Sequence, residues 1–213
     1  MPYPSPLRQS NTAPRTACAP GDREAEDFAC TLITSRQHVS PKRLVAPGPD
    51  AAQLERMLGA AAAAPDHGQL TPWRFVIVPQ DKRVLLAEVF ALALTDRDAG
   101  ATAEQIASAR EKAHRAPLLM LAVARLGRSE PDIPAEERLV SLGCALQNML
   151  LVAHAMGFGA GLTAGRAMTS PRLRELFGLA EGERAVCCIN VGSVTKRRPM
   201  RLRPAPTAIV STL

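Results

Sequence analysis

The chain has 213 residues, of which 46% are hydrophobic, 22% charged and 3% aromatic, and its formal net charge is +6. A chain of this length buries a sizeable core without disulfide or metal support, and so few aromatic residues argue against a surface that stacks single-stranded nucleic acid. Most of the excess charge lies near the C-terminus, so a general nucleic-acid face is not expected. The residues of this basic cluster are Lys196, Arg197, Arg198, Arg201 and Arg203.

The cysteine pattern indicates neither a disulfide framework nor a zinc site, because no C-x-x-C pair occurs. Free cysteines are typical of the reducing cytoplasm. Residues 1–10 lack the pattern of a signal peptide, and the most apolar long segment, residues 139–156, contains Gln147 and His154. We therefore expect a cytoplasmic protein without a membrane span. The five cysteines are Cys18, Cys30, Cys144, Cys187 and Cys188.

Prolines recur through residues 1–22, which we expect to form a flexible N-terminal arm. A first helix is expected at residues 23–35, with the apolar residues Phe28 and Ile33 on one side. A single domain is expected to occupy residues 23–213.

The second helix is expected to begin after Asp50, where Gln53 three residues later completes a capping-box pattern. It ends before Pro65, since proline cannot continue a helix. The elements expected after it are a strand at 73–79, two polar helices at 81–97 and 102–115, a strand at 117–125, a long helix at 134–156, a short segment at 158–163, a helix at 170–178, a strand at 183–194 and a short terminal strand at 208–210. Helices separate the strands, which indicates a layered arrangement of both element types.

Four glycines follow the long helix, in the segment 157–165. They do not have the dinucleotide-binding pattern, and they follow a helix rather than a strand. Gly157 is accounted for as the end of the helix. The other three leave open either a tight turn or a backbone that closely approaches a planar ligand.

Two polar segments have both a structural and a functional interpretation. Residues 36–38 offer a guanidinium, an amide and an imidazole, which suits either a polar helix end or a phosphate site. His67 lies in the loop 64–75, which also contains two prolines and the only tryptophan; it is either a satisfied loop histidine or a ligand contact. The basic cluster is likewise either a solvated tail or a phosphate site.

Three segments together resemble the nitroreductase superfamily, in particular its minimal bacterial branch of small NAD(P)H nitroreductases. They are SRQHVSPKRL at 35–44, APDHGQLTPWRF at 64–75 and GCALQNMLLVAHAMGFG at 143–159, with Arg-Ala-Pro before the second long strand. The resemblance implies an α+β fold with a central mixed sheet flanked by helices. It also implies an intertwined homodimer that binds FMN at two sites in the subunit interface, with the long helix forming that interface.

The resemblance assigns flavin contacts to ten residues. Arg36, Gln37 and His38 would hold the flavin phosphate and ring edge; Pro65 and His67 would line the flavin; the backbone of Leu162, Thr163, Ala164 and Gly165 would face the ring; and Arg197 would meet the phosphate. At Ala63 the family has an arginine. No catalytic side chain and no metal ligand are expected.

The resemblance further implies that NAD(P)H reduces the cofactor and that a nitroaromatic or quinone-like acceptor then enters the same pocket, with ping-pong kinetics. Two alternatives remain open. One is a related flavin-fold enzyme with another task, such as flavin destruction or dehalogenation. The other is a non-catalytic basic protein that binds nucleic acid or another protein, and it predicts a colourless protein with salt-dependent binding.

Overall fold

A computed structural model describes residues 22–127, 132–196, 199 and 202–213. Its five strands form one sheet in the order β1–β5–β3–β2, with β4 also paired to β5. Every ladder is antiparallel, and an isolated bridge between His38 and Ala160 adds a parallel pairing. The strands are β1 (Leu44–Val45), β2 (Trp73–Ile77), β3 (Leu118–Arg125), β4 (Gly159–Thr163) and β5 (Glu183–Val194).

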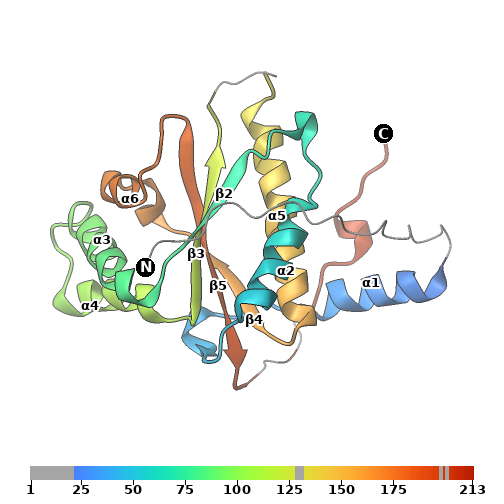
Figure 1. Cartoon of the computed structure of the whole chain (residues 1–213), viewed down its shortest axis with the longest axis horizontal. Coiled ribbons are helices and arrows are strands. Elements are labelled where there is room, and N and C mark those ends of the chain that lie inside the picture. Colours follow the sequence, from blue (N-terminus) through green and yellow to red (C-terminus); the bar gives the residue numbers. More distant parts are fainter. Residues whose placement is uncertain (1–21, 128–131, 197–198, 200–201) are drawn as a thin grey trace.

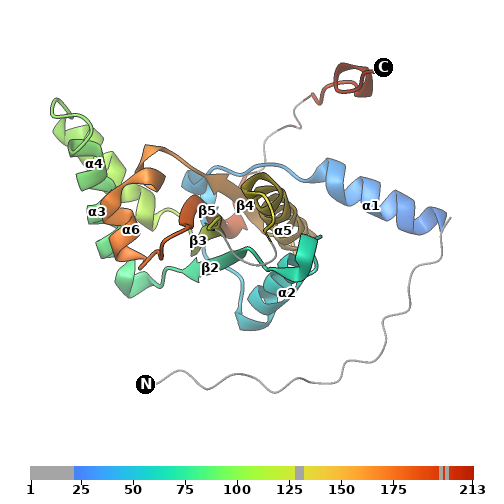
Figure 2. The same cartoon turned by 90° about the horizontal axis from the view of Figure 1, so that it is seen from above.

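Helices cover both faces of the sheet. Figure 2 shows α2 and α5 on one side of the strands and α3, α4 and α6 on the other, while α1 extends away from the body. The helices are α1 (Arg23–Ser35), α2 (Ala51–Ala62), α3 (Arg83–Thr95), α4 (Ala103–Glu111), α5 (Ala135–Ala155) and α6 (Pro171–Leu176). None of the helices within the described ranges combines the length and hydropathy of a membrane span.

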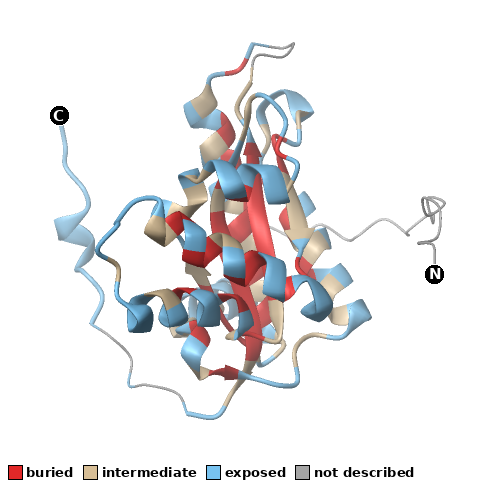
Figure 3. Ribbon diagram, turned by 90° about the vertical axis from the view of Figure 1, so that its left-hand side faces the viewer, coloured by how far each residue is buried: buried red, intermediate tan, exposed pale blue. Residues whose placement is uncertain are grey.

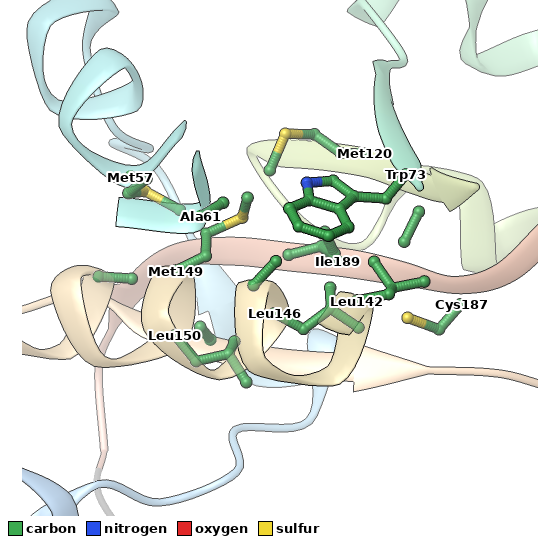
Figure 4. Packing of buried hydrophobic residues seen from close by; sticks show 14 of the residues in the cluster. Met57, Ala61, Trp73, Met120, Leu142, Leu146, Met149, Leu150, Cys187 and Ile189 are labelled. Carbon is green, nitrogen blue, oxygen red and sulfur yellow. The ribbon is translucent and has the colours of Figure 1, made fainter. Parts of the chain in front are cut away.

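Two hydrophobic cores result, one on each face of the sheet. The first joins α2 and α5 to the strands, and Figure 4 shows Trp73 packed among Met120, Leu142 and Ile189. The second lies under α3, α4 and α6. The adjacent residues Cys187 and Cys188 belong to the first and the second core respectively, because successive strand residues point to opposite faces. Figure 3 shows that burial is concentrated in the sheet and in the helix faces that cover it.

Local sequence accounts for most element ends. Asp50 and Gln53 form the expected capping box at α2: Asp50 Oδ1 accepts from Gln53 N at 2.8 Å, and Gln53 Oε1 accepts from Asp50 N at 2.9 Å. Gly157 follows the end of α5 with φ of 88°, a left-handed conformation that favours glycine. Both boundaries agree with the sequence expectation.

Two expectations about elements are wrong. Residues 208–210 form no strand; a short 3-10 turn spans Pro206–Ala208, and Ile209 and Val210 are exposed. The helix expected to be polar at 81–97 is largely apolar, because Leu86, Phe90 and neighbouring alanines of α3 fill the second core. The helix α1 has the expected bounds, but its apolar Phe28 and Ile33 stay exposed within one chain.

A buried arginine ties the second core to the connection before β3. Arg83 is 1% exposed and donates to four backbone carbonyls, those of Val78, Ala113, Ala116 and Pro117. It thereby links the start of α3, the chain beyond β2 and the turn after α4. This turn carries residues that line the larger of the two cavities described next.

Candidate active site

A small cavity lies between the C-terminal ends of α1 and α5. Arg36 directly follows α1, and its Nε atom is buried without a hydrogen-bond partner among the described residues. Burial lowers the pKa of this guanidinium, and the nearby Arg203 lowers it further. A buried cationic nitrogen without an acceptor is a ready partner for an anion. Arg36, Gln37, His38, Arg43, His154 and Lys196 all line this cavity.

A second cavity of about 390 Å³ adjoins the first on the side of α3 and α4. Thr163, the last residue of β4, forms part of its wall together with Ala164 and Gly165, which follow the strand. The Leu162 side chain packs against the first core instead, on the other face of the sheet. The predicted ring-facing segment therefore presents three of its four residues to one cavity.

His38 lines both cavities and so connects them. Val39 N donates to Ala160 O at 2.9 Å, which holds the segment after α1 against β4. Gly161 makes this approach possible, since a side chain there would collide with the Val39 carbonyl oxygen and the His38 ring. The glycine in β4 thus places the imidazole at the junction of the two cavities.

The amide of Asn190 orients a hydroxyl on the wall of the larger cavity. Asn190 is 1% exposed in β5, and its Nδ2 donates to Thr163 Oγ1 at 3.0 Å. Because the hydroxyl oxygen accepts this bond, the hydroxyl hydrogen of Thr163 is left for another acceptor.

Pro65 and His67 are not brought to these cavities within one chain. Both are exposed in the loop after α2, and His67 Nδ1 lies 2.7 Å from Oε2 of Glu137 in the first turn of α5. The Arg36 cavity contains His154 of the last turn, 17 residues further along the helix, or about 25 Å at 1.5 Å per residue. Figure 1 shows β4 near the C-terminal end of α5 and the end of α2 toward the other.

The remaining predicted residue, Arg197, lies outside the described residues. Its neighbour Lys196 lines the small cavity. Sequence reasoning did not select Lys112, Arg115 or Asn190, which line the larger one. For Arg115 a signal was present, because it begins the Arg-Ala-Pro motif before β3.

The family model described as the nitroreductase family matches residues 36–193, which contain the larger cavity, most of the lining of the small one and the loop of His67. The chain belongs to the nitroreductase family. A Haemophilus influenzae protein named as an NAD(P)H nitroreductase is 34% identical over 179 residues, covering 84% of this chain and 95% of the relative. Escherichia coli YdjA, with the same type of name, is 32% identical over 184 residues, covering 86% of this chain and 98% of YdjA. The chain is accordingly a nitroreductase-type enzyme.

Solved structures show the same fold. A nitroreductase-like protein from Bacillus cereus superposes with a TM-score of 0.75 at 20% identity, covering 86% of this chain and 95% of that one. A variant of the FMN- and NADPH-dependent nitroreductase NfnB from a Sphingopyxis strain superposes with a TM-score of 0.68 at 17% identity, covering 86% of this chain and 98% of that one. The α+β nitroreductase fold expected from the sequence is confirmed.

Proposed function

We propose that this nitroreductase-family enzyme is an FMN-dependent oxidoreductase that uses NAD(P)H to reduce nitroaromatic or quinone-like acceptors. One observation carries the proposal: His38 joins a cavity with a buried, unpartnered guanidinium nitrogen to a larger cavity of about 390 Å³. An anion site next to a larger hollow suits a ligand that has a phosphate at one end and a planar ring system at the other.

In this proposal Arg36, Gln37 and His38 hold the phosphate end of the cofactor. The unpartnered Nε of Arg36 supplies a charge-assisted donor, and Lys196 adds a second cation on the same cavity. Arg197 of the same basic segment is proposed as a further phosphate contact. Part of the C-terminal basic cluster then has a function beyond solubility.

The larger cavity accommodates the ring and the substrates. Thr163, Ala164 and Gly165 form the wall toward the ring, and Leu162 contributes through its backbone because its side chain faces the core. The Thr163 hydroxyl, oriented by Asn190, supplies a donor to whatever acceptor lies against this wall. When bound, FMN would supply hydride chemistry, and NAD(P)H and the acceptor would use the cavity in turn, which predicts ping-pong kinetics.

A homodimer completes the site in this proposal. His67 contacts the first turn of α5, about 25 Å along this helix from the Arg36 cavity, and Pro65 belongs to the same loop, so one chain does not bring these residues together. A second copy with an antiparallel α5 would bring its His67 loop to this cavity. The outer face of α5 supports such a contact, because it carries an uncharged row at helical spacing that remains accessible. The row is Val140, Cys144, Gln147 and Leu151.

We further propose that residues 23–213 act as one domain and that the enzyme works in the cytoplasm. The described cysteines are unpaired, as is usual in a reducing compartment.

The visible absorption spectrum of the purified protein tests the proposal first. A flavin spectrum, with FMN identified after denaturation at about one per chain, is expected. Steady-state rates with varied NADPH and a nitroaromatic acceptor should give parallel double-reciprocal lines. A colourless protein that also fails to bind added FMN would overturn the cofactor assignment.

A further inference from the structure

Among the described residues, the larger cavity is lined by positive but not by negative side chains, and binding of a flavin ring does not require this excess of positive charge. Four basic residues line it, and none of the described lining residues is an aspartate or a glutamate. They come from three separate elements: the end of α3, the turn after α4 and the segment after β4. A cleft lined by charges of one sign concentrates ions of the opposite sign. The four are Arg97, Lys112, Arg115 and Arg166.

Two of the neighbouring carboxylates are engaged outside the cavity, and a third pairs with one of the four cations. Asp96, beside Arg97, forms an ion pair with Arg172 at 2.6 Å, and Asp98 Oδ1 accepts from Gly100 N at 3.0 Å. Glu111, beside Lys112, accepts from Arg115 Nη2 at 3.1 Å. The ion pair with Glu111 offsets the charge of Arg115, whereas Arg97, Lys112 and Arg166 form no ion pair within the described part of the chain, so their positive charge stays available.

Arg115 points to the same ligand chemistry from a buried position. Its side chain is 13% exposed, and its Nε atom is buried without a hydrogen-bond partner among the described residues. Arg36 has a similarly unpartnered Nε atom in the small cavity. Each of the two cavities is therefore lined by one arginine whose Nε is buried without a hydrogen-bond partner among the described residues.

We propose that the larger cavity selects ligands that carry an anionic group, and that Arg97, Lys112 and Arg166 bind this group as an aromatic carboxylate on the electron acceptor. The inference rests on the proposed function, in which the flavin phosphate occupies the Arg36 cavity and leaves these three cations to the substrate. Exposed basic side chains around a hollow bind a carboxylate without the desolvation cost of a buried charge.

The phosphates of the reducing dinucleotide are also anionic and could bind the same cations. Two pairs of ligands, each differing only in the anionic group, distinguish an acceptor carboxylate from a dinucleotide phosphate. Equilibrium binding is measured by calorimetry on the FMN-saturated protein without reductant. One pair is 4-nitrobenzoate against 4-nitrobenzamide, and the other is adenosine 2′,5′-bisphosphate against adenosine. We expect 4-nitrobenzoate to bind about tenfold more tightly than the amide, and the preference to shrink as salt is raised.

The variants Arg97→Gln and Arg166→Gln should each remove several-fold of this preference without changing the affinity for the amide. Arg56→Gln is the matched control, since Arg56 is exposed on α2 at the opposite face of the sheet. Equal affinities for acid and amide, or the same loss in the control, would overturn the carboxylate assignment. If only the bisphosphate shows the preference, the cations serve the dinucleotide and the acceptor proposal fails.

Binding without reductant keeps this test separate from the proposed function. A protein that takes up no FMN contradicts the proposed function whatever the titrations show. A yellow, active enzyme that treats 4-nitrobenzoate and 4-nitrobenzamide alike in binding and in kcat/KM contradicts only the present inference.

Discussion

Arg74 and Glu183 join β2 to β5 across the intervening strand β3 by a two-armed ion pair, with Nε and Nη2 each 2.7 Å from a carboxylate oxygen. The hydrogen bond to Arg74 is the main cause that lowers the pKa of Glu183 from 4.5 to about 2. The Glu183 side chain is 11% exposed, so solvent screens the pair only weakly.

A depressed carboxyl pKa stabilises the folded protein above the pKa of the unfolded chain, and this stability is lost as the carboxylate becomes protonated. Between about pH 4.5 and pH 2 the Glu183 contribution should therefore disappear. At pH 7, Glu183→Gln should lower the free energy of unfolding by about 2–3 kcal/mol. Urea unfolding at pH 7 and at pH 3 measures this difference in the free energy of unfolding, and Glu181→Gln, at an exposed residue, is the control. A deficit of the same size at both pH values would contradict the role of the ion pair.

The buried Arg83 should be among the most sensitive positions of the fold. Arg83→Met keeps much of the volume but leaves four carbonyls without their donor, which we expect to cost about 3 kcal/mol or more. Arg110→Met removes an exposed arginine that is paired with Glu88, and it should change stability little. Thermal unfolding of both variants compares them, and equal shifts would show that the carbonyl contacts are not needed.

Arg36 should recognise the phosphate of FMN rather than its ring. Arg36→Gln is expected to weaken FMN binding about tenfold or more, because it removes a partly buried charged donor. Riboflavin, which lacks the phosphate, should bind both proteins equally. Fluorescence titration with the two ligands makes the comparison, and an equal loss for riboflavin would indicate a general distortion of the site.

Two subunits that each lack a different site residue should form one intact FMN site when they are combined in a heterodimer. If His67 contributes to the site of its partner, Arg36→Gln and His67→Ala homodimers both lose FMN affinity. A heterodimer of these variants then contains one intact site and one doubly altered site. Mixing the two after reversible dissociation should recover up to half of the wild-type FMN binding per dimer. No recovery in a verified heterodimer would place both residues in the same subunit's site.

The outer face of α5 should hold the dimer together. Val140 is 66% exposed in the single chain, and Val140→Arg should produce monomers and reduce bound FMN in parallel. Val84→Arg alters a valine that is 58% exposed on α3 and serves as the matched control. Light scattering after size-exclusion chromatography gives the mass. A dimeric Val140→Arg protein with full FMN content would exclude this face as the interface.

Local signals explain what the sequence could predict. The side chains of Asp50 and Gln53 act within one turn, and Gly157 has the backbone freedom that a helix end requires, so these boundaries were accessible. The order of the strands depends on pairings far apart in the chain, which no local pattern records. The sequence predicts a polar helix at 81–97 because charged residues gather at both ends of this range, whereas the part between them that forms most of α3 is largely apolar.

Only part of the candidate site could be predicted from the sequence, again because some of its contacts join residues that are far apart in the chain. The resemblance selected Arg36, His38 and the segment at the end of β4, and Arg36, His38 and residues 163–165 line two adjoining cavities in the structure. Arg115 stands in the Arg-Ala-Pro motif, but Asn190 has no such signal, because its importance depends on what the fold places opposite it. The bond from Asn190 to Thr163 spans 27 residues of sequence and follows from the pairing of β4 with β5.

The adjacent Cys187 and Cys188 lie on opposite faces of the sheet, so the reactivity of each thiol reports local opening on its own face. Burial raises the pKa of the Cys187 thiol to about 11 and that of Cys188 to about 12, so both react slowly while their core layers are closed. Each thiol becomes more reactive when its own side of the sheet loosens, and Cys188 also lines the larger cavity, so its labelling is compared at a fixed occupancy of that cavity. Pulsed alkylation read by fragment mass would therefore show, for two neighbouring residues, whether the α5 layer or the α3 layer separates from the sheet first.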